Sequence, residues 1–334
     1  MPNQPTGKAR TIVITGGTSG IGHACAAAIL SSHYGPWHVV LPCRDAGRGK
    51  AAVDKLAGAA VAANTVEAMP LDLASLASVR AFAAELASRV RLGVRSGEIP
   101  PLYALVCNAG VQAGTSLTTT DDGFESTFGV NHLGHFLLVN ELMPILQPPA
   151  RVVVVSSDTH DPALKVGVPA PAWNSTPALA RGELGPAAAY DRPFSAGQRR
   201  YSTSKLANIY FTYALARRLP AGVTANAFNP GLVPGTGLQR EAVAPLRFAA
   251  EHVLPHVRWL LRRVVTPNVH TLEESGGSLA WLATAPELTG TTGKYFDQRQ
   301  AIASSEESYD SVRAEQLWED SLTLTAQPRS AAPA

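Results

Sequence analysis

The feature that most constrains this chain is a glycine-rich run, TGGTSGIG, at residues 15–22. It follows a short β-branched segment, residues 11–15, and precedes a pattern typical of a helix, residues 21–33. Glycine allows the sharp turn and the close helix packing that the first connection of a parallel βαβ unit requires. The run therefore predicts an α/β fold whose first strand ends where the glycines begin.

The rest of the chain continues to alternate between strands and helices. Apolar, β-branched runs separate segments with helical periodicity, which is the pattern of βαβ units. Right-handed crossovers then assemble one doubly wound parallel sheet of the Rossmann type, buried on both faces. Further strands are expected at residues 37–43, 66–72, 102–108, 151–157, 223–229 and 293–297, and further helices at residues 45–56, 76–90, 124–146 and 202–219.

The chain of 334 residues is expected to form a single domain over residues 10–320. Its hydrophobic content of 46% supplies a large core. Residues 158–200 are rich in Pro, Ala and Gly without a clear period, which indicates an insertion. Residues 240–268 are expected to form a helical lid over the substrate, and residues 1–9 and 325–334 to be flexible ends.

Charge and cysteine content exclude several classes of function. A net charge of +2 gives no reason to expect a nucleic acid partner. Cys25, Cys43 and Cys107 have neither metal-ligand nor disulfide spacing, and a reducing compartment suits them. The polar N-terminus lacks the apolar centre of a signal peptide, and no apolar run is long enough to span a bilayer. We therefore expect a cytoplasmic protein without a metal site.

The glycine-rich run has the composition of a dinucleotide site. Gly16 would make the tight turn, Gly20 would let the backbone approach a pyrophosphate, and Gly22 would allow the helix to pack closely on the strand. The N–H groups at the start of the helix would then point at the phosphates. The cofactor-binding residues expected in this turn are Gly16, Thr18, Ser19, Gly20, Ile21 and Gly22.

The ends of the next strands indicate which dinucleotide binds. An NAD site usually ends its second strand with an acid that accepts from the ribose 2′-hydroxyl, whereas this strand ends in LPCRD. Arg44 can bind a 2′-phosphate and Arg48 could assist, so we expect NADPH. Asp45 is an acid at the same place, and both arginines could instead be solvated loop cations. Further cofactor contacts are expected from Asp72 (at the adenine amine), Leu73, Asn108, Ala109 and Gly110.

Tyr201 and Lys205, in YSTSK, stand one helical turn apart. A surface ion pair or chance would explain this spacing taken alone. The other interpretation is a proton donor beside the cation that tunes it. A free tyrosine titrates at about pH 10 and is poorly matched to proton transfer at neutral pH.

Six motifs at strand ends and helix starts occur in order along the chain. They are TGGTSGIG, the NAG at residues 108–110, Asn131 in VNHLGHF, the serine ending VVVVSS, Tyr201 with Lys205, and the PG at residues 230–231. From about residue 10 to residue 297, the chain resembles a short-chain dehydrogenase/reductase.

The resemblance implies a role for each matching residue. Tyr201 would be the acid or base at the substrate oxygen, and Lys205 would lower the pKa of Tyr201 and hold the nicotinamide ribose. Ser157, rather than Ser156, would orient the substrate carbonyl, and Asn131 would anchor a water that relays protons to Lys205. The loop after the sixth strand would hold the nicotinamide carboxamide, with contacts from Pro230, Gly231, Val233 and Thr236.

The long gap between Ser157 and Tyr201 points to a branch of the family. With GFESTFGVNHLGHFLL and PGLVPGTGLQRE, it resembles light-dependent protochlorophyllide reductases and, more distantly, retinol dehydrogenases. Both branches imply NADPH and a large apolar substrate. The protochlorophyllide reductases carry a cysteine just after the PG, where this chain has Leu232. Leucine cannot deliver a proton, so this difference argues against photochemical reduction.

We therefore expect an NADPH-dependent reductase that acts on a bulky apolar carbonyl or conjugated alkene in the dark. The alternatives are a light-dependent protochlorophyllide reductase and a catalytically idle NADP-binding sensor or scaffold. The apolar face expected in residues 242–265 suits a lid or shallow contact with a membrane. His132 and His135 are expected to support the site or the core, and either a homo-oligomer or a monomer is compatible with the sequence.

Overall fold

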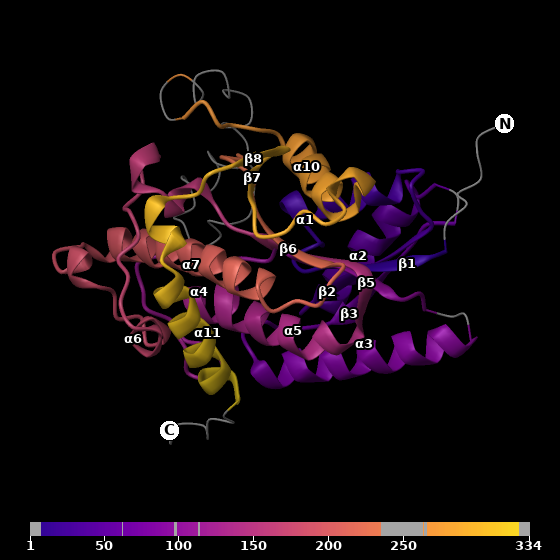
Figure 1. Ribbon diagram of the computed structural model, residues 1–334, viewed down its shortest axis with the longest axis horizontal. Helices are drawn as coiled ribbons and strands as arrows, with labels where there is room; N and C mark the ends of the chain where they lie inside the picture. Colours follow the sequence, from indigo (N-terminus) through magenta and orange to yellow (C-terminus); the bar gives the residue numbers. More distant parts are fainter. Residues whose placement is uncertain are drawn as a thin grey trace.

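Eight strands form one sheet at the centre of the molecule in this computed structural model, which describes residues 8–61, 63–96, 99–112, 114–234, 263 and 266–326 (Figure 1). In chain order the strands are β1 (Arg10–Ile14), β2 (Trp37–Cys43), β3 (Thr65–Pro70), β4 (Leu102–Cys107), β5 (Leu146–Val155), β6 (Val223–Asn229), β7 (Tyr295–Asp297) and β8 (Gln300–Ile302).

The strands lie in the order β3-β2-β1-β4-β5-β6-β7-β8. Neighbours from β3 to β7 are parallel, and β8 is antiparallel to β7. The order changes direction between β1 and β4, which in doubly wound sheets is the place where a ligand binds at the carboxyl edge. The predicted fold class is confirmed. The antiparallel β8 was not predicted, because three exposed residues carry too short a pattern.

Helices cover both faces of the sheet, with α1, α2 and α10 on one side and α3, α5 and α7 on the other (Figure 1). Their bounds are α1 (Gly20–Leu30), α2 (Ala46–Ala57), α3 (Leu76–Ser96), α4 (Ser126–Phe128), a π-helical segment (Gly129–Gly134), α5 (His135–Leu142), α6 (Thr176–Ala180), α7 (Pro193–Ala216), α10 (Leu272–Thr284) and α11 (Ser311–Ala326). Short 3-10 turns cover Met143–Ile145, Asp158–His160, Pro162–Leu164, Pro186–Ala188, Pro286–Leu288 and Glu306–Tyr309.

Alternate residues of β1 enter two different cores. Ile12 and Ile14 pack with α1 and α10, whereas Val13 packs with α3 and α5 on the other face. Side chains of a strand point alternately to opposite faces, so a strand covered on both sides must be apolar at every position. This requirement explains the continuous apolar runs that predicted the strands.

Two predicted elements differ from the structure. The helix carrying Tyr201 begins at Pro193 rather than at residue 202, so residues 193–200 belong to α7 and not to the insertion. Proline is favourable there, because the first turn of a helix needs no N–H donor. The helix expected over residues 124–146 contains the π-helical segment 129–134, which periodicity cannot distinguish from an α-helix.

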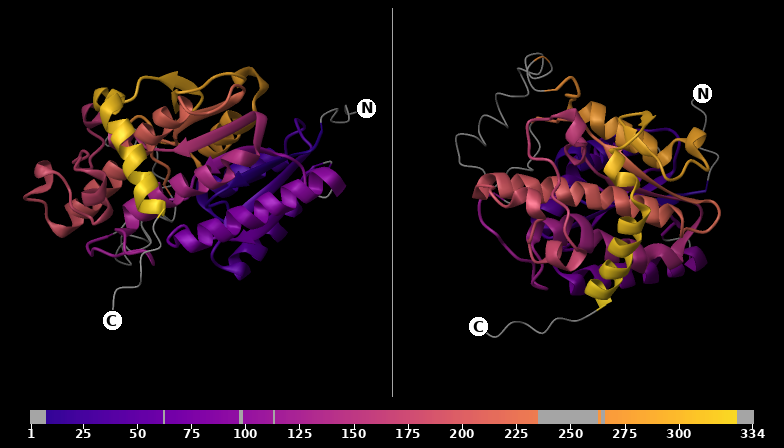
Figure 2. Two further views of the ribbon diagram at one scale, coloured as in Figure 1. Left: turned by 60° about the horizontal axis from the view of Figure 1, so that its bottom comes forward. Right: turned by 60° about the vertical axis from the view of Figure 1, so that its left-hand side comes forward.

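The C-terminal helix α11 was not predicted. It crosses α7 (Figure 2), and Trp318 packs edge-on against Phe136 of α5 and stacks on Phe211 of α7. Thr325 is buried, and its backbone carbonyl accepts a hydrogen bond from the guanidinium of Arg80. Residues 325 and 326 therefore belong to this helix, rather than to the flexible end expected to begin at residue 325.

The described residues just after β6 pair with those that precede α10. Leu232 forms a bridge with Val269, and the N–H of Leu232 donates to the carbonyl of Asn268 at 2.8 Å. Most of the lid expected at residues 240–268, and Thr236, lie outside the described residues. Within the described part of the chain, we find no helix with the length and apolar character needed to cross a membrane.

Replacement of Gly276 by alanine should weaken the packing of α10 on α1. A Cβ there would lie 2.4 Å from Cβ of Ala24, a distance that requires the helices to move apart. We expect Gly276→Ala to lower the free energy of unfolding by about 1–3 kcal/mol in chemical denaturation. Gly277→Ala is the matched control, because a Cβ at that position meets nothing within 4 Å. Equal effects of the two substitutions would show that the close approach is not limiting.

Candidate active site

Two glycines in the turn after β1 have backbone conformations that favour glycine. Gly16 has φ +67° and Gly20 has φ +58°. A Cβ at Gly22 would lie 2.5 Å from Nδ2 of Asn108 and from the carbonyl oxygen of Gly16. Gly16 and Gly20 are therefore required by their backbone conformation, and Gly22 by its close approach to Asn108 and Gly16. The approach of a pyrophosphate to Gly20 stays a prediction.

The N-terminus of α1 opens onto this turn. Ser19 is the N-cap and has an extended backbone, and the first helical turn runs from Gly20 through Ile21 to Gly22. Thr18 and Ser19 are half-buried at the same place. The first N–H groups of a helix have no partner within the helix, so an 11-residue helix starting here suits an anionic group.

Thr15 joins the glycine turn to the end of β4. Its Oγ1 accepts from the N–H groups of Asn108 and Ala109, at 2.9 and 3.0 Å, and lies 2.9 Å from Nε2 of His135. Nδ2 of Asn108 returns a bond to the carbonyl of Thr15 at 2.8 Å. These bonds bring residues 108–110 to the carboxyl edge of the sheet, beside the glycine turn.

Arg44 and Asp72 follow β2 and β3 at the same edge. Nη1 of Arg44 lies 3.9 Å from Oδ2 of Asp72, and the Arg44 side chain is 66% exposed. Asp45 caps α2, because its Oδ1 accepts from the N–H of Arg48 at 2.8 Å. The Asp45 carboxylate is thus hydrogen-bonded to its own helix, and the Arg44 side chain remains accessible. Leu73, next to Asp72, is buried.

Lys205 is buried behind the end of β5. Its Nζ donates to the carbonyl of Val155 at 3.1 Å and lies 5.4 Å from the ring centre of Tyr201. Burial lowers the pKa of Lys205 to about 8. The charge of this lysine therefore changes within an ordinary working range of pH.

The two serines that follow β5 have separate surroundings. Oγ of Ser156 donates to the backbone carbonyl of Lys205 at 2.8 Å, which ties α7 to the sheet. Oγ of Ser157 instead donates to Oδ1 of Asp158 at 3.1 Å and accepts from the N–H of Thr159 at 3.2 Å. Burial, and after it the nearby charge of Asp158, raise the pKa of Tyr201, and the Ser157 side chain opposes this shift. Ser156 is thus engaged with the backbone of α7, and the role of Ser157 at the substrate stays a prediction.

Asn131 lies in the π-helical segment and is fully buried. Its amide pairs with the backbone of Val111, with Oδ1 accepting at 2.8 Å and Nδ2 donating at 2.9 Å. Nδ2 also donates to Oγ of Ser204 at 3.0 Å. Asn131 therefore links the segment after β4 to α7 next to Lys205.

The loop after β6 is tied to its neighbours by Asn229. Oδ1 of Asn229 accepts from the N–H of Gly231 at 3.0 Å and from the N–H of Asp158 at 3.1 Å. Gly231 has φ +68°, and Pro230 and Val233 are buried beside it. Thr236, expected here too, falls in the part of the chain that the structure leaves undescribed.

Sequence reasoning missed several residues of this site. Thr15 lies within the glycine run, whose pattern assigns it no role, and no motif singles out Asn229 or Asp158. Thr15 directly follows β1, Asn229 ends β6 and Asp158 lies three residues after β5. These positions were the available signal, since parallel strands bring such residues to one edge.

The two histidines have different surroundings in the buried helix. Nδ1 of His135 lies 3.1 Å from the carbonyl of Asn131, and burial lowers the pKa of His135 to about 4. His132 lies among aromatic rings with Nε2 2.9 Å from Oγ of Ser321, and burial lowers the pKa of His132 to about 3. In the described residues no group of three or more His, Cys, Asp or Glu side chains could hold a metal ion.

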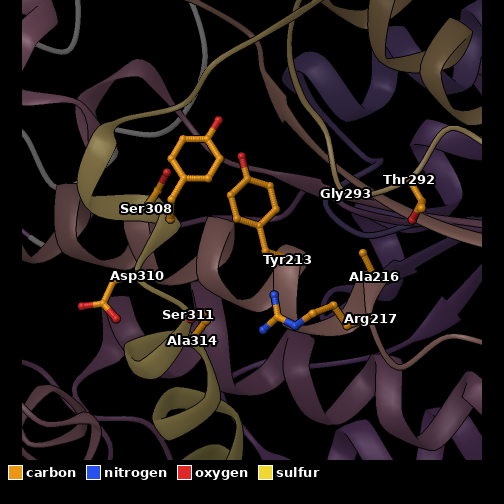
Figure 3. Close-up of a pocket in the computed structure, with 10 residues that line it drawn as sticks. Tyr213, Ala216, Arg217, Thr292, Gly293, Ser308, Asp310, Ser311 and Ala314 are labelled. Carbon is orange, nitrogen blue, oxygen red and sulfur yellow. The ribbon is translucent and has the colours of Figure 1, made fainter.

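A separate cavity of about 340 Å³ lies farther along α7. Tyr213 and Arg217 of α7 line it together with Asp310 and Ser311 (Figure 3). Tyr213 stands 12 residues after Tyr201, or about 18 Å along a helix. None of the residues predicted for catalysis or cofactor binding lines this cavity.

Known proteins share much of this sequence. A model of the short chain dehydrogenase family matches residues 10–168. Mouse retinol dehydrogenase 14 is 38% identical over 93% of this chain and 84% of its own length. Barley protochlorophyllide reductase B is 35% identical over 95% of this chain and 80% of its own. The WW domain-containing oxidoreductase of chicken is 37% identical over 93% of this chain, but the chain spans only 66% of that protein.

Solved structures share the fold. An uncharacterized protein from Mycobacterium paratuberculosis is 28% identical, with a TM-score of 0.61 and coverage of 98% of this chain and 97% of its own. A blue fluorescent protein from a metagenomic library, solved with NADPH, is 22% identical with a TM-score of 0.59, and covers 88% of this chain and 98% of its own. The predicted resemblance is confirmed: the chain belongs to the short-chain dehydrogenase/reductase family.

Proposed function

We propose that this oxidoreductase uses NADPH to reduce a bulky apolar carbonyl or conjugated alkene, with Tyr201 as the proton donor. The observation that carries the proposal is the buried Lys205 at the end of β5, with its Nζ 5.4 Å from the ring centre of Tyr201 and with Ser157 two residues after that strand. A phenol, a hydroxyl beside it and a buried ammonium group are the parts that proton transfer to a substrate oxygen needs.

The residues at the carboxyl edge fit a nicotinamide dinucleotide. The turn at Gly16 and Gly20 and the N-terminus of α1 would hold the pyrophosphate. A Cβ at Gly110 would lie 3.7 Å from Nζ of Lys205, so a backbone without side chain leaves room beside the ammonium group. When bound, the reduced cofactor supplies the hydride.

Each catalytic side chain then has a defined task. The Ser157 hydroxyl and the Tyr201 phenol would bind the substrate oxygen, and Tyr201 would transfer its proton to that oxygen. Lys205 would stabilise the phenolate that remains, because a positive charge nearby lowers the pKa of a phenol. Asn131 would keep the backbone after β4 and the helix of Lys205 in register.

The 2′-phosphate would bind at Arg44. The guanidinium is mostly exposed, so it is accessible to a phosphate. The Asp45 carboxylate, which could otherwise favour an unphosphorylated ribose, accepts from the N–H of Arg48. The exposed Arg44 and the hydrogen-bonded Asp45 support NADPH over NADH. Arg48 would be a second cation for the phosphate, and Asp72 would lie near the adenine.

The relatives support an apolar substrate with a carbonyl or conjugated double bond. Their names give retinol for one and protochlorophyllide for another. Leu232, at the position where the light-dependent reductases carry a cysteine, is 37% exposed and cannot exchange a proton. We therefore favour a dark reaction on a retinal-like aldehyde or enone. Light-dependent reduction of protochlorophyllide is the second candidate, supported by the 35% identity to the barley enzyme.

A catalytically idle NADP-binding protein is a weaker proposal, since the described site retains Asn131, Ser157, Tyr201 and Lys205 in contact with one another or with shared neighbours. A cytoplasmic location, a homo-oligomer and shallow membrane contact stay predictions.

The direct test of function is turnover of retinal by the purified chain with NADPH in the dark, followed by protochlorophyllide in the dark and under light. We expect retinal to be reduced, and Tyr201→Phe to lower kcat at least about a hundredfold while NADPH still binds. Tyr213→Phe removes a phenol from the same helix outside the site and should retain activity.

The outcomes separate the candidates. Product from protochlorophyllide only after illumination would replace the dark reductase by the photoenzyme. Full activity of Tyr201→Phe would show that another group donates the proton.

Removal of Arg44 should change cofactor preference. Loss of charged hydrogen bonds to a phosphate costs roughly 1.5–3 kcal/mol, so Arg44→Ala should weaken NADPH binding about tenfold to a hundredfold. NADH binding, measured in the same fluorescence titration, should change little. Lys50→Ala removes an exposed cation of α2 that pairs with Asp54 and serves as the control. An equal loss of both cofactors would place the 2′-phosphate elsewhere.

Lys205 should impose a fall in reductive kcat/KM as pH rises through about 8. Its pKa is lowered to about 8, so its charge is present below that pH and lost above it. Lys205→Arg keeps a charge across this range, because arginine does not deprotonate in proteins. The variant should lose the fall near pH 8, even at a lower absolute rate. An unchanged fall in the variant would assign the titration to another group.

A further inference from the structure

Another cavity, of about 740 Å³, lies between the segment that follows β5 and the turn that precedes α11. Its volume is in the range of sites that bind small molecules. None of the residues assigned above to catalysis or to cofactor binding lines it. We call it the acidic groove, after the lining carboxylates of Asp161, Glu306, Glu307 and Asp310.

A single guanidinium in the acidic groove, that of Arg313, balances only part of this charge. Its Nη1 pairs with Glu307, and its Nε lies 3.3 Å from Oδ2 of Asp310. Asp310 also caps α11, because its Oδ1 accepts from the N–H of Arg313 at 3.0 Å. Among the described residues, Asp161 and Glu306 have no such ion pair. The groove therefore has an excess of negative charge, although the whole chain carries a net charge of +2.

A buried hydroxyl without a partner is an independent sign of a ligand. Ser305 lines the acidic groove and is only 3% exposed, and its Oγ has no hydrogen-bond partner within the described part of the chain. The residue stands at the N-cap of the turn Glu306–Tyr309, but its side chain makes no capping bond. Most buried hydroxyls in proteins are hydrogen-bonded, because an unpaired one costs free energy. A ligand that donates to Oγ of Ser305 would remove this cost.

Other lining residues suit an organic cation rather than a metal ion. Tyr309 is 56% exposed and stacks on Tyr213 with ring centres 5.5 Å apart, so part of its ring is open to a cation. Pro162 and Ala163 add apolar surface next to Asp161. The described residues include no group of His, Cys, Asp and Glu that could hold a metal ion. An ammonium group has three donors and no acceptor, which matches carboxylates and a hydroxyl.

His160 places the acidic groove beside the segment of Ser157. Nε2 of His160 accepts from the N–H of Ser305 at 3.0 Å. Its Nδ1 therefore carries the proton of the neutral ring and donates to the carbonyl of Ser157 at 2.6 Å. The groove thus adjoins the candidate active site without sharing its assigned residues.

We propose that the acidic groove binds a small aliphatic polyamine, which is a chain of methylene groups with two or more ammonium groups. The ammonium groups pair with carboxylates from two segments, Asp161 after β5 and Glu306 before α11. One of them donates to Oγ of Ser305. The methylene groups lie on Pro162 and Ala163. This site is separate from the proposed hydride transfer and does not depend on it.

Isothermal titration calorimetry of the full chain with spermidine tests the proposal. We expect saturable binding that weakens as salt is added, because the paired groups are open to solvent. Asp161→Asn combined with Glu306→Gln should lower the affinity about tenfold. Asp54→Asn combined with Glu273→Gln is the matched control. It removes the same charge from exposed positions of α2 and α10 and should bind spermidine as the wild type does.

Ser305→Ala tests the hydroxyl separately. Because Oγ of Ser305 has no partner in the described structure, its removal should not lower the free energy of unfolding. The affinity for spermidine should fall about threefold to tenfold, the effect of losing one hydrogen bond. This variant decides the question if the double variant of Asp161 and Glu306 does not fold.

Two further probes separate the kinds of ligand. Octanediol has a comparable chain without charge, and Mg²⁺ has the charge without the chain, so neither should displace spermidine at equal concentration. Displacement by either probe would overturn the assignment to a polyamine. The absence of spermidine binding, or the same affinity in the wild type, the double variant and Ser305→Ala, would overturn the site itself. No substrate is needed, so failure of the proposed reaction would leave these results intact.

Discussion

The carbonyl of Val155 is the point on which the candidate site depends. It ends β5 and accepts from Nζ of Lys205 and from Nδ2 of Asn208, each at 3.1 Å. Oγ of Ser156 returns a bond to the backbone of Lys205. These three bonds attach α7, which carries Tyr201 and Lys205, to the carboxyl edge of the sheet, where Ser157 follows β5. The place of the helix at this edge thus follows from bonds to the backbone of the strand and of the helix.

A buried ion pair orients the same helix from the other side. Nε of Arg200 lies 3.6 Å from Oε1 of Glu125, and both residues are nearly inaccessible. The Glu125 carboxylate also accepts from the N–H groups of Thr127 and Phe128, and so caps the helix that leads to Asn131. Separation of a buried pair leaves an unpaired buried charge, which is strongly destabilising. The two side chains must therefore keep their relative positions. The residue before Tyr201 is thereby coupled to the element that carries Asn131.

Sequence reasoning could identify the fold and most of the edge residues, because both follow from local patterns. The apolar runs required by two-sided burial predicted seven of the strands, and the glycine turn required by its backbone angles located the first connection. The segment of Asn131 was expected as a continuous α-helix, since apolar periodicity does not reveal a π-helical turn.

Contacts between distant parts of the chain could not be read in this way. His132 meets Ser321, and Asp158 meets Asn229, through tertiary packing that no spacing in the sequence records. The helix α11 likewise depends on its packing against Phe136 and Phe211, whose apolar character is already explained by the core. Such pairs determine how the side chains of the site are held, whereas the local motifs determine which side chains are there.

The central claim is that the glycine turn and the Tyr201–Lys205 pair form one nicotinamide-dependent centre. A crystal structure of the chain with NADP⁺ tests it most directly. The account predicts the pyrophosphate against the N–H groups of residues 20–22 and the nicotinamide ribose within hydrogen-bond distance of Nζ of Lys205. A cofactor bound away from the glycine turn, or a Lys205 that makes no contact with the ribose, would contradict it.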